Sequence, residues 1–252
     1  MPKRRSPGLI QLRGLKTISW LSRDRLNRLA AALTLTVVEK RGIIFDDKHR
    51  GESAYILLSG VGRMTCRNRK GERILVIMIA PGMIPVIPRE VVGITYQFRC
   101  EAVTECQIGT IAIDKFIEIC LGITSENFKQ MAQSYLGRWD LVQLRCSNFM
   151  NCTLEERLAL TLLELADNFG VAGKHGMTLA VPARHRDLAE LVGASRPRVT
   201  EHLMRFERNK WIVRENREIA VMPDRLESFL DKSRLAPLAR AKRIKKTTPI
   251  LY

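Results

Sequence analysis

The spacing of apolar residues changes twice along the chain, and each change predicts a different kind of element. Over residues 24–36 apolar side chains recur at helical spacing, which predicts a short leading helix. From residue 37 to about residue 113 the pattern becomes short β-rich runs between turn residues, as at 55–58, 74–79, 98–103 and 108–113. Many short strands at this spacing predict an antiparallel β-roll or barrel.

A long helix is predicted next, over residues 125–148. Apolar residues follow one another there in alternating steps of four and three, with charged and amide side chains between them. Such a heptad pattern gives a narrow apolar stripe, which is typical of a helix that packs against a parallel copy of itself. A helix buried in the core of its own domain is the alternative. The predicted dimer seam consists of Phe128, Ala132, Tyr135, Trp139, Val142, Cys146 and Phe149.

The C-terminal part of the chain predicts several short elements in a specific order. Thr153 and Glu156 have capping-box spacing, which starts a helix that ends near Gly170. A short helix over 185–192, a turn at Gly193 and Ala194, and a second helix over 196–209 capped by Ser195 follow. Two β runs on either side of a polar tip at 214–217 complete the pattern as a wing. Together these elements predict a winged helix-turn-helix.

The second helix of such a motif lies in the DNA major groove, with its N-terminal residues against base edges. Arginine matches the O6 and N7 acceptors of guanine, and a glutamate accepts from the amino group of cytosine. The predicted base-reading residues are Ser195, Arg196, Arg198, Thr200, Glu201 and His202. Side chains at the start of the first helix and in the wing are placed for phosphates instead. These are Arg184, His185, Arg186, Arg214 and Arg217.

Charge and cysteine content limit the possible functions less than the winged helix-turn-helix motif does. The net charge is +16, and residues 1–16 and 234–252 carry basic side chains without any acid. The termini are therefore predicted to be basic arms on a mildly basic body, either tracking DNA phosphates or serving as solvated tails. The six cysteines contain no C-x-x-C pair, so reduced thiols are expected instead of a zinc site or a disulfide framework.

Several classes of protein are disfavoured by what the sequence does not contain. No apolar run approaches a membrane span and no secretory signal is visible, so a soluble cytoplasmic protein without membrane association is expected. No phosphate-binding glycine loop, metal cluster or nucleophile motif is present, which predicts no enzyme activity, no metal and no cofactor.

The chain resembles the CRP/FNR family, which includes the cyclic AMP receptor protein, over about residues 15–230. Its strongest matching stretch is 187–199, close to the helix-turn-helix signature of that family, and the stretches 55–60, 70–73 and 80–82 support it. The resemblance implies a homodimer on a two-fold operator of double-stranded DNA and contact with RNA polymerase.

The chain also departs from the sensors of that family. Tyr96 and Gln97 stand where cyclic-nucleotide-binding members carry Arg followed by Ser or Thr, so the phosphate would lack its cation. The early cysteine cluster of the iron-sulfur members is absent, and no histidine occurs between His49 and His175 for a haem. Pro197 and Glu201 replace the family's usual Glu and Arg, so a different operator sequence is expected.

The resulting prediction is an α+β protein with five parts. These are a basic N-terminal arm (1–16), a cyclic-nucleotide-binding-like antiparallel β-roll (17–124), a long dimerisation helix (125–150), a C-terminal winged helix-turn-helix domain (151–232) and a basic tail (233–252). The predicted function is that of a sequence-specific transcription regulator that does not respond to cyclic AMP. A regulator gated by an unidentified small molecule and a nucleoid-type structural protein are the alternatives.

Overall fold

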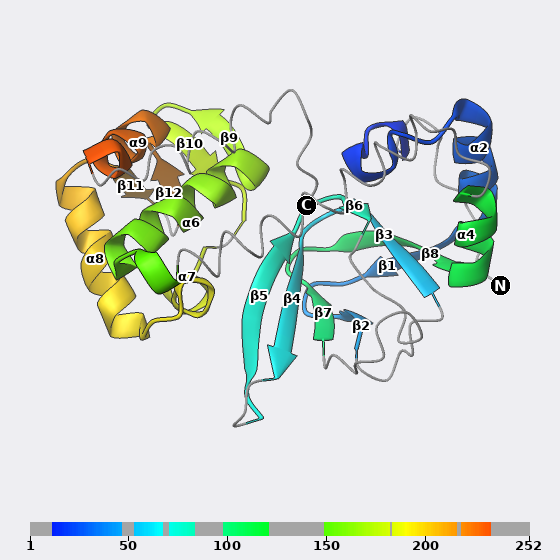
Figure 1. The fold of residues 1–252 in the computed structure, drawn as a ribbon, viewed down its shortest axis with the longest axis horizontal. Coiled ribbons are helices and arrows are strands. Elements are labelled where there is room, and N and C mark those ends of the chain that lie inside the picture. The colour runs from blue at the N-terminus through cyan, green and yellow to red at the C-terminus, as the bar shows by residue number, and fades with distance from the viewer. Residues whose placement is uncertain are drawn as a thin grey trace. The chain divides into compact units, whose positions relative to one another are not determined.

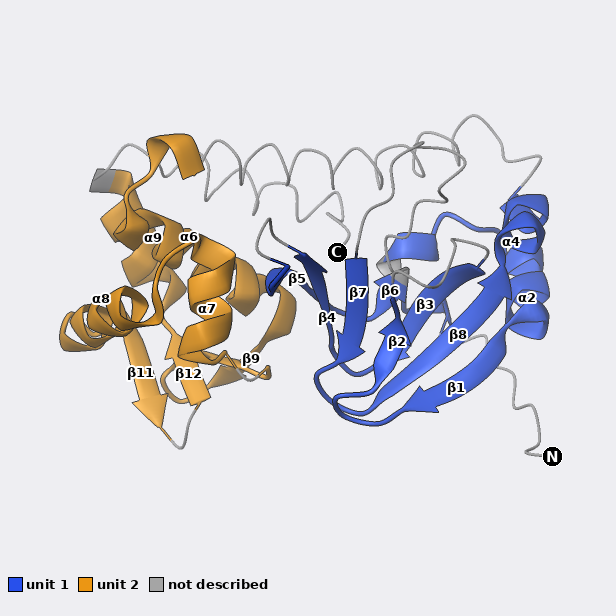
Figure 2. Cartoon of the chain, turned by 90° about the horizontal axis from the view of Figure 1, so that it is seen from below, with its two compact units in different colours: residues 1–138, 251–252 blue, residues 139–250 orange. Residues whose placement is uncertain are grey.

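A computed structural model describes residues 12–46, 53–67, 71–83, 98–120, 149–181, 183–215 and 218–232. The chain divides into two compact units, residues 1–138 with 251–252 and residues 139–250 (Figure 2). The limit between them falls inside the segment predicted as the dimerisation helix. Among the helices of the described segments, none has the length and apolar character needed to cross a membrane.

The strands that the structure describes in the first unit form two four-stranded sheets, and all of their pairings are antiparallel. The sheet orders are β1-β8-β3-β6 and β2-β7-β4-β5. The strands are β1 (Thr34–Val38), β2 (Ile43–Phe45), β3 (Ser53–Ser59), β4 (Gly62–Arg67), β5 (Arg73–Ile79), β6 (Gly82–Met83), β7 (Phe98–Ala102) and β8 (Cys106–Ala112). The predicted antiparallel β domain is thereby confirmed.

Apolar and polar residues do not alternate along strand β3, because both of its faces are buried. Tyr55 and Leu57 point into a core between the two sheets, with Met64, Cys100 and Ile108 from β4, β7 and β8. The other face of β3 packs under the helical elements η1 (Lys16–Ile18), α2 (Arg23–Ala32) and α4 (Ile113–Cys120). The five cysteines that the structure describes are free, as expected.

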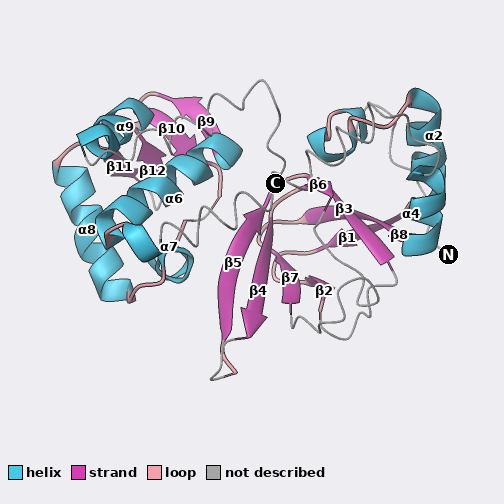
Figure 3. Cartoon of the chain, viewed as in Figure 1, coloured by secondary structure: helices cyan, strands magenta, loops and turns pink. Residues whose placement is uncertain are grey.

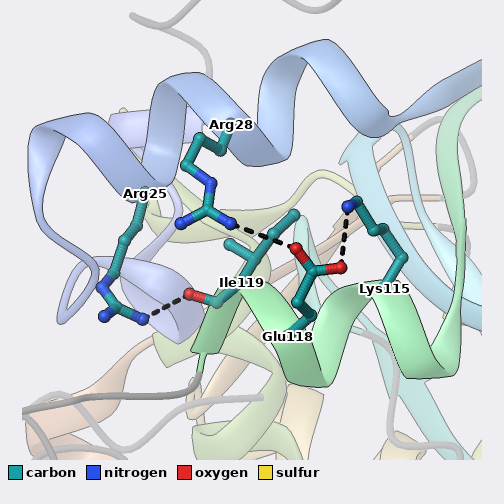
Figure 4. A network of polar contacts seen from close by, with 5 residues as sticks. All are labelled: Arg25, Arg28, Lys115, Glu118 and Ile119. Atoms are coloured by element: carbon teal, nitrogen blue, oxygen red, sulfur yellow. Dashed lines mark hydrogen bonds and ion pairs between the residues drawn. The ribbon is translucent and has the colours of Figure 1, made fainter.

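Helices α2 and α4 are joined by polar contacts on their exposed side (Figure 4). Arg25 donates to the carbonyl oxygen of Ile119, in the last turn of α4. Glu118 pairs with Arg28 at 3.4 Å and with Lys115 at 2.7 Å. The C-terminal end of α4 is thus fixed to α2 by a side chain that satisfies one of its otherwise unpaired carbonyls.

The prediction of a leading helix over residues 24–36 was correct for its first part only. Helix α2 ends at Ala32, and residues 34–38 form β1, which pairs along its whole length with β8. Thr34, Thr36, Val37 and Val38 are β-branched, and the sheet partner decides their conformation over the helical spacing. Helix α4 was not predicted, because the strand pattern over 108–113 overlaps it only at Ile113 and no element was predicted over residues 114–120.

In the described part of the second unit, the helices α6, α7, α8 and α9 accompany one sheet (Figure 3). Its elements are α6 (Leu154–Phe169), β9 (Gly170–Gly173), β10 (Gly176–Leu179), α7 (His185–Val192), α8 (Arg196–Arg208), β11 (Ile212–Glu215), β12 (Glu218–Val221) and α9 (Pro223–Lys232). The predicted wing, β11 and β12, is not an isolated pair of strands. It belongs to a four-stranded antiparallel sheet of order β11-β12-β10-β9, in which β10 pairs with β12.

Six of the seven predicted dimer-seam residues, those from Phe128 to Cys146, lie outside the described residues, as do the basic tail and residues 1–11 of the predicted N-terminal arm. The end of that arm is described, and there Leu12 and Leu15 are buried in the core of the first unit, so this part is folded and is not a free arm. Phe149 is described, and it is half exposed beside the more exposed Met150. The dimer seam remains a prediction.

Helix α6 begins with the predicted capping box. The backbone N–H of Glu156 donates to the hydroxyl oxygen of Thr153, and a carboxylate oxygen of Glu156 accepts from the backbone N–H of Thr153 at 2.7 Å. Two backbone groups that the helix leaves unpaired are thereby satisfied.

Replacing this cap should destabilise the second unit. We expect Thr153→Ala to lower the free energy of unfolding by about 1 kcal/mol, because the first turn of α6 loses its acceptor. Chemical denaturation monitored by tryptophan fluorescence measures the change, since Trp211 lies in this unit. Thr153→Ser keeps the hydroxyl and is expected to stay near the wild type, and an equal loss in both variants would contradict the capping role.

Candidate nucleic-acid interface

Helix α8 is held through one narrow apolar face. Val199, Leu203 and Phe206 are completely buried, at the spacing of four and three that puts them on one side of a helix. Phe206 packs edge-on against Trp211, with ring centroids 5.1 Å apart. The opposite side is exposed along its whole length and carries Pro197, Glu201, Met204 and Arg208. In Figure 1 α8 lies next to α7 within the second unit. One side of the helix is therefore fixed and the other is available for contact.

The N-terminal end of α8 presents four of the predicted base-reading residues to solvent. Ser195, Arg196, Arg198 and Glu201 are all exposed. Ser195 occupies the N-cap position, as predicted, but its side chain makes no capping hydrogen bond, so its hydroxyl is not used by the helix. The backbone N–H groups at this end of α8 favour an anion nearby, and no acidic side chain lies in the first turn.

Two predicted base-reading residues lie at the flanks of the exposed face. The hydroxyl of Thr200 donates to the carbonyl oxygen of Arg196 at 2.9 Å, so its proton is used within the helix. On the other flank, Nδ1 of His202 is buried and has no hydrogen-bond partner. Neither side chain projects as freely as Arg196 or Glu201 does.

A chain of hydrogen bonds joins the start of α7 to α8 and the wing. His185 Nδ1 lies 2.8 Å from the Thr200 hydroxyl oxygen, and Arg214 Nη1 lies 3.4 Å from His185 Nε2. Arg214 also donates from Nε to a carboxylate oxygen of Glu207 at 3.0 Å, and from Nη2 to the same oxygen. A guanidinium only donates, so His185 Nε2 accepts, and the proton of the neutral imidazole is on Nδ1, facing Thr200.

The surroundings of His185 favour its neutral form. Burial lowers the pKa of the imidazole, and the positive charges of Arg214 and Arg196 lower it further. A second proton, on Nε2, would point at the Arg214 guanidinium and remove the only acceptor that this contact has. The link between wing and helix α7 therefore depends on an uncharged histidine.

The other predicted phosphate-contacting residues are placed differently. Arg184 is exposed at the N-cap of α7, without a capping hydrogen bond, and its guanidinium is not needed by the helix. Arg186 is exposed and pairs with Glu190 at 3.0 Å, one helical turn away. Arg214 is the exception among these arginines, because it is half-buried in the network just described. Arg217 lies outside the described residues.

Sequence reasoning missed residues in the later turns of α8. Arg205 Nη1 pairs with a carboxylate oxygen of Glu155 on α6 at 3.1 Å, and Glu207 holds Arg214. Met204 is an exposed apolar side chain on the outward side. Extending the outward spacing from Pro197 and Glu201 by steps of three and four predicts Met204 and Arg208. The pairing of Arg205 with a distant helix has no signal in the sequence.

The turn between α7 and α8 needs its glycine. Gly193 has φ +64° and ψ 48°, in the left-handed region. Its N–H donates to the carbonyl oxygen of Glu190, and the N–H of Ala194 donates to that of Ala189 at 2.9 Å. These bonds close the C-terminal end of α7 and direct the chain into α8 after two residues.

The arrangement suits an extended polyanion better than a small substrate. Six exposed arginines lie on α7, α8 and the residue that caps α7, and these are Arg184, Arg186, Arg196, Arg198, Arg205 and Arg208. Glu190, Glu155 and Glu207 pair with arginines on the protein side and leave the tip of α8 positive. A rigid helix with arginines at its exposed N-terminal end has the shape and charge that major-groove binding requires.

Comparison with known proteins agrees with this geometry. Residues 156–229 match the Crp-like helix-turn-helix domain. The global nitrogen regulator of Synechococcus elongatus is 23% identical over 191 residues, which are 75% of this chain and 86% of that protein.

Solved structures give the same result for the fold. The structure of FixK2 from Bradyrhizobium japonicum has a TM-score of 0.65 at 19% identity, over 78% of this chain and 96% of that one. The CRP-family transcriptional regulator TTHB099 from Thermus thermophilus has a TM-score of 0.61 at 20% identity, over 80% of this chain and 96% of that one.

The state of His185 should make the second unit sensitive to acid. Because the folded-state pKa lies below that of the unfolded chain, neutral His185 stabilises the fold above about pH 6.5, and this contribution is lost as the pH falls below that value. We expect His185→Gln, which does not titrate, to lose less stability than the wild type between about pH 7.5 and about pH 5. Urea unfolding at both pH values measures the difference, with His175→Gln as the matched control. Equal pH dependence of the wild type and His185→Gln would contradict the assignment.

Proposed function

The chain carries a Crp-like helix-turn-helix domain on the fold of the CRP/FNR transcription regulators, and we propose that it is a sequence-specific regulator that binds a two-fold operator as a homodimer. The proteins that this chain matches share the function of a DNA-binding regulator. The operator symmetry, the homodimer and a cytoplasmic location belong to the proposal.

One observation carries the proposed DNA reading. Helix α8 buries one face completely and leaves Arg196, Arg198 and Glu201 exposed around its N-terminal end, on a helix that the core holds in place. Base reading needs donors and acceptors on a support that does not move relative to the phosphate contacts. Arg184 and Arg186, on the neighbouring helix, supply cations for phosphates.

The homodimer rests on the heptad pattern and on Phe149. This last seam residue keeps 48% of its surface exposed, next to Met150 at 78%. An apolar end of a predicted coiled-coil helix is expected to be covered by the second copy. Contact of the dimer with RNA polymerase, to activate or to repress, completes the proposal.

Regulation without cyclic AMP rests on residues 96 and 97, which lie outside the described part of the chain. Tyr and Gln at these positions offer no cation for a cyclic phosphate. There are two alternatives: a regulator whose DNA binding is controlled by a different small molecule, and a nucleoid-type structural protein that coats DNA. Selection of genomic fragments separates them.

Genomic selection with the purified, reduced protein and no added small molecule tests the proposal. We expect enrichment of fragments that share a palindromic motif with half-sites about one helical turn apart. Binding of all fragments with a steep salt dependence and no motif would support the structural coat and contradict the proposal. Enrichment that appears only after a cell extract of small molecules is added would support the gated regulator.

Arg196 should determine one base of the selected motif. We expect Arg196→Ala to lose preference at a single position in each half-site, at a cost of about 1–3 kcal/mol, because a bidentate contact to guanine disappears. Repeating the selection with this variant measures the loss. Arg186→Ala removes the same charge from α7 and is expected to weaken binding to all sequences and to leave the motif unchanged. An unaltered motif in Arg196→Ala would contradict the role of Arg196 in base reading.

A further inference from the structure

A single guanidinium links the first turn of α6 to the end of α7. Arg157 donates from Nε to the carbonyl oxygen of Val192 at 3.1 Å and from Nη1 to that of Cys152 at 2.8 Å. Val192 is the last residue of α7, and its carbonyl has no acceptor role within that helix. Arg157 therefore supplies the partner for a group that immediately precedes the Gly193 turn.

An aromatic ring covers the same turn from outside. The Arg157 guanidinium lies over the ring of Phe149, 5.3 Å from its centroid. A Cβ added to Gly193 would lie 2.4 Å from Cε1 of Phe149, so the ring occupies the space that a side chain at this position needs. The glycine is thus required for its positive φ and for the close approach of Phe149.

The first turn of α6 also contacts α8 directly. Glu155, whose side chain is 13% exposed, pairs with Arg205 on α8 at 3.1 Å. The capping box of Thr153 and Glu156 fixes the same turn. Two side chains of one helical turn, Glu155 and Arg157, therefore reach the two ends of the segment that carries the predicted base-reading residues.

We infer that Phe149 and Arg157 are positioning residues for DNA recognition, and that with Glu155 they form a joint that fixes how α8 is presented. The inference rests on the proposed function. Neither residue lies on the exposed face of α8, and their effect is exerted through the Gly193 turn. Only two residues separate Val192 from the N-cap Ser195, so a displacement of the Val192 carbonyl is passed to the N-terminal end of α8. Phe149 connects this joint to the segment that precedes α6.

Loss of the joint should affect specific binding more than general binding to DNA. Non-specific affinity depends on the number of cations near phosphates, whereas base contacts require the position of α8. We expect Arg157→Gln to weaken binding to the selected operator at least about tenfold, as measured by fluorescence anisotropy. Its affinity for a scrambled duplex should fall no more than that of the control.

Arg225→Gln is the matched control. Arg225 also donates to a main-chain carbonyl, that of Lys210 at 2.9 Å, in the same unit and away from the joint. An equal ratio of operator to scrambled affinity in Arg157→Gln and Arg225→Gln would overturn the inference. A wild-type protein without sequence preference would contradict the proposed function instead.

A second pair of variants tests the joint without DNA. Gly193→Ala should lower the Tm through its positive φ and through the clash with Phe149. In a Phe149→Ala background, which removes the ring, we expect the same substitution to lower the Tm by clearly less. Equal decreases in both backgrounds would show that Phe149 does not pack on the turn and would overturn the joint, whatever the protein does with DNA. Amide hydrogen exchange gives a third readout, because Arg157→Gln should accelerate exchange at Ala194 and leave the middle of α6 unchanged.

Discussion

The burial of one side of α8 is the constraint on which the second unit depends. Val199, Leu203 and Phe206 attach the helix to its domain through three side chains on about a third of its circumference. A wider apolar face would hold the helix more strongly but would leave less of it for DNA. A narrow face needs support from polar contacts at its edges, and His185, Arg214 and Glu155 supply them through Thr200, Glu207 and Arg205 of α8.

The polar contacts around α8 divide the arginines of the second unit into two groups with different tasks. Arg214 and Arg157 are partly or largely surrounded by protein groups and connect α8 or its turn to the wing and to α6. Arg196 and Arg198 are exposed, and no side-chain contact among the described residues gives either of them a role in stabilising the fold. Both groups look alike in the sequence, where Arg214 is predicted to contact phosphates. Burial and geometry assign Arg214 to the support of the wing, with Glu207 as its partner.

The sequence predicts the local elements of the second unit well, because short-range rules decide them. The capping spacing of Thr153 and Glu156, and the Gly193 turn, place α6, α7 and α8 within a residue or two of their observed limits. Longer-range pairing explains the errors. Residues 34–36 join a strand since β8 lies beside them, and β9 and β10 extend the wing into a larger sheet. The hydrogen-bond network of His185 joins residues that are far apart in the chain, so no local sequence pattern predicts it.

The glutamates beside the arginines have a consequence for the energetics of DNA binding. Glu155, Glu190 and Glu207 act as counterions that are built into the protein. When a phosphate approaches Arg186 or Arg205, it exchanges with a carboxylate instead of adding to a bare cation. Under the proposed function, such an exchange gains less free energy per contact than binding to an unpaired arginine, so the affinity for non-operator DNA is expected to be lower than the number of arginines implies. The same carboxylates would then shorten the residence time of the protein on sequences other than its operator.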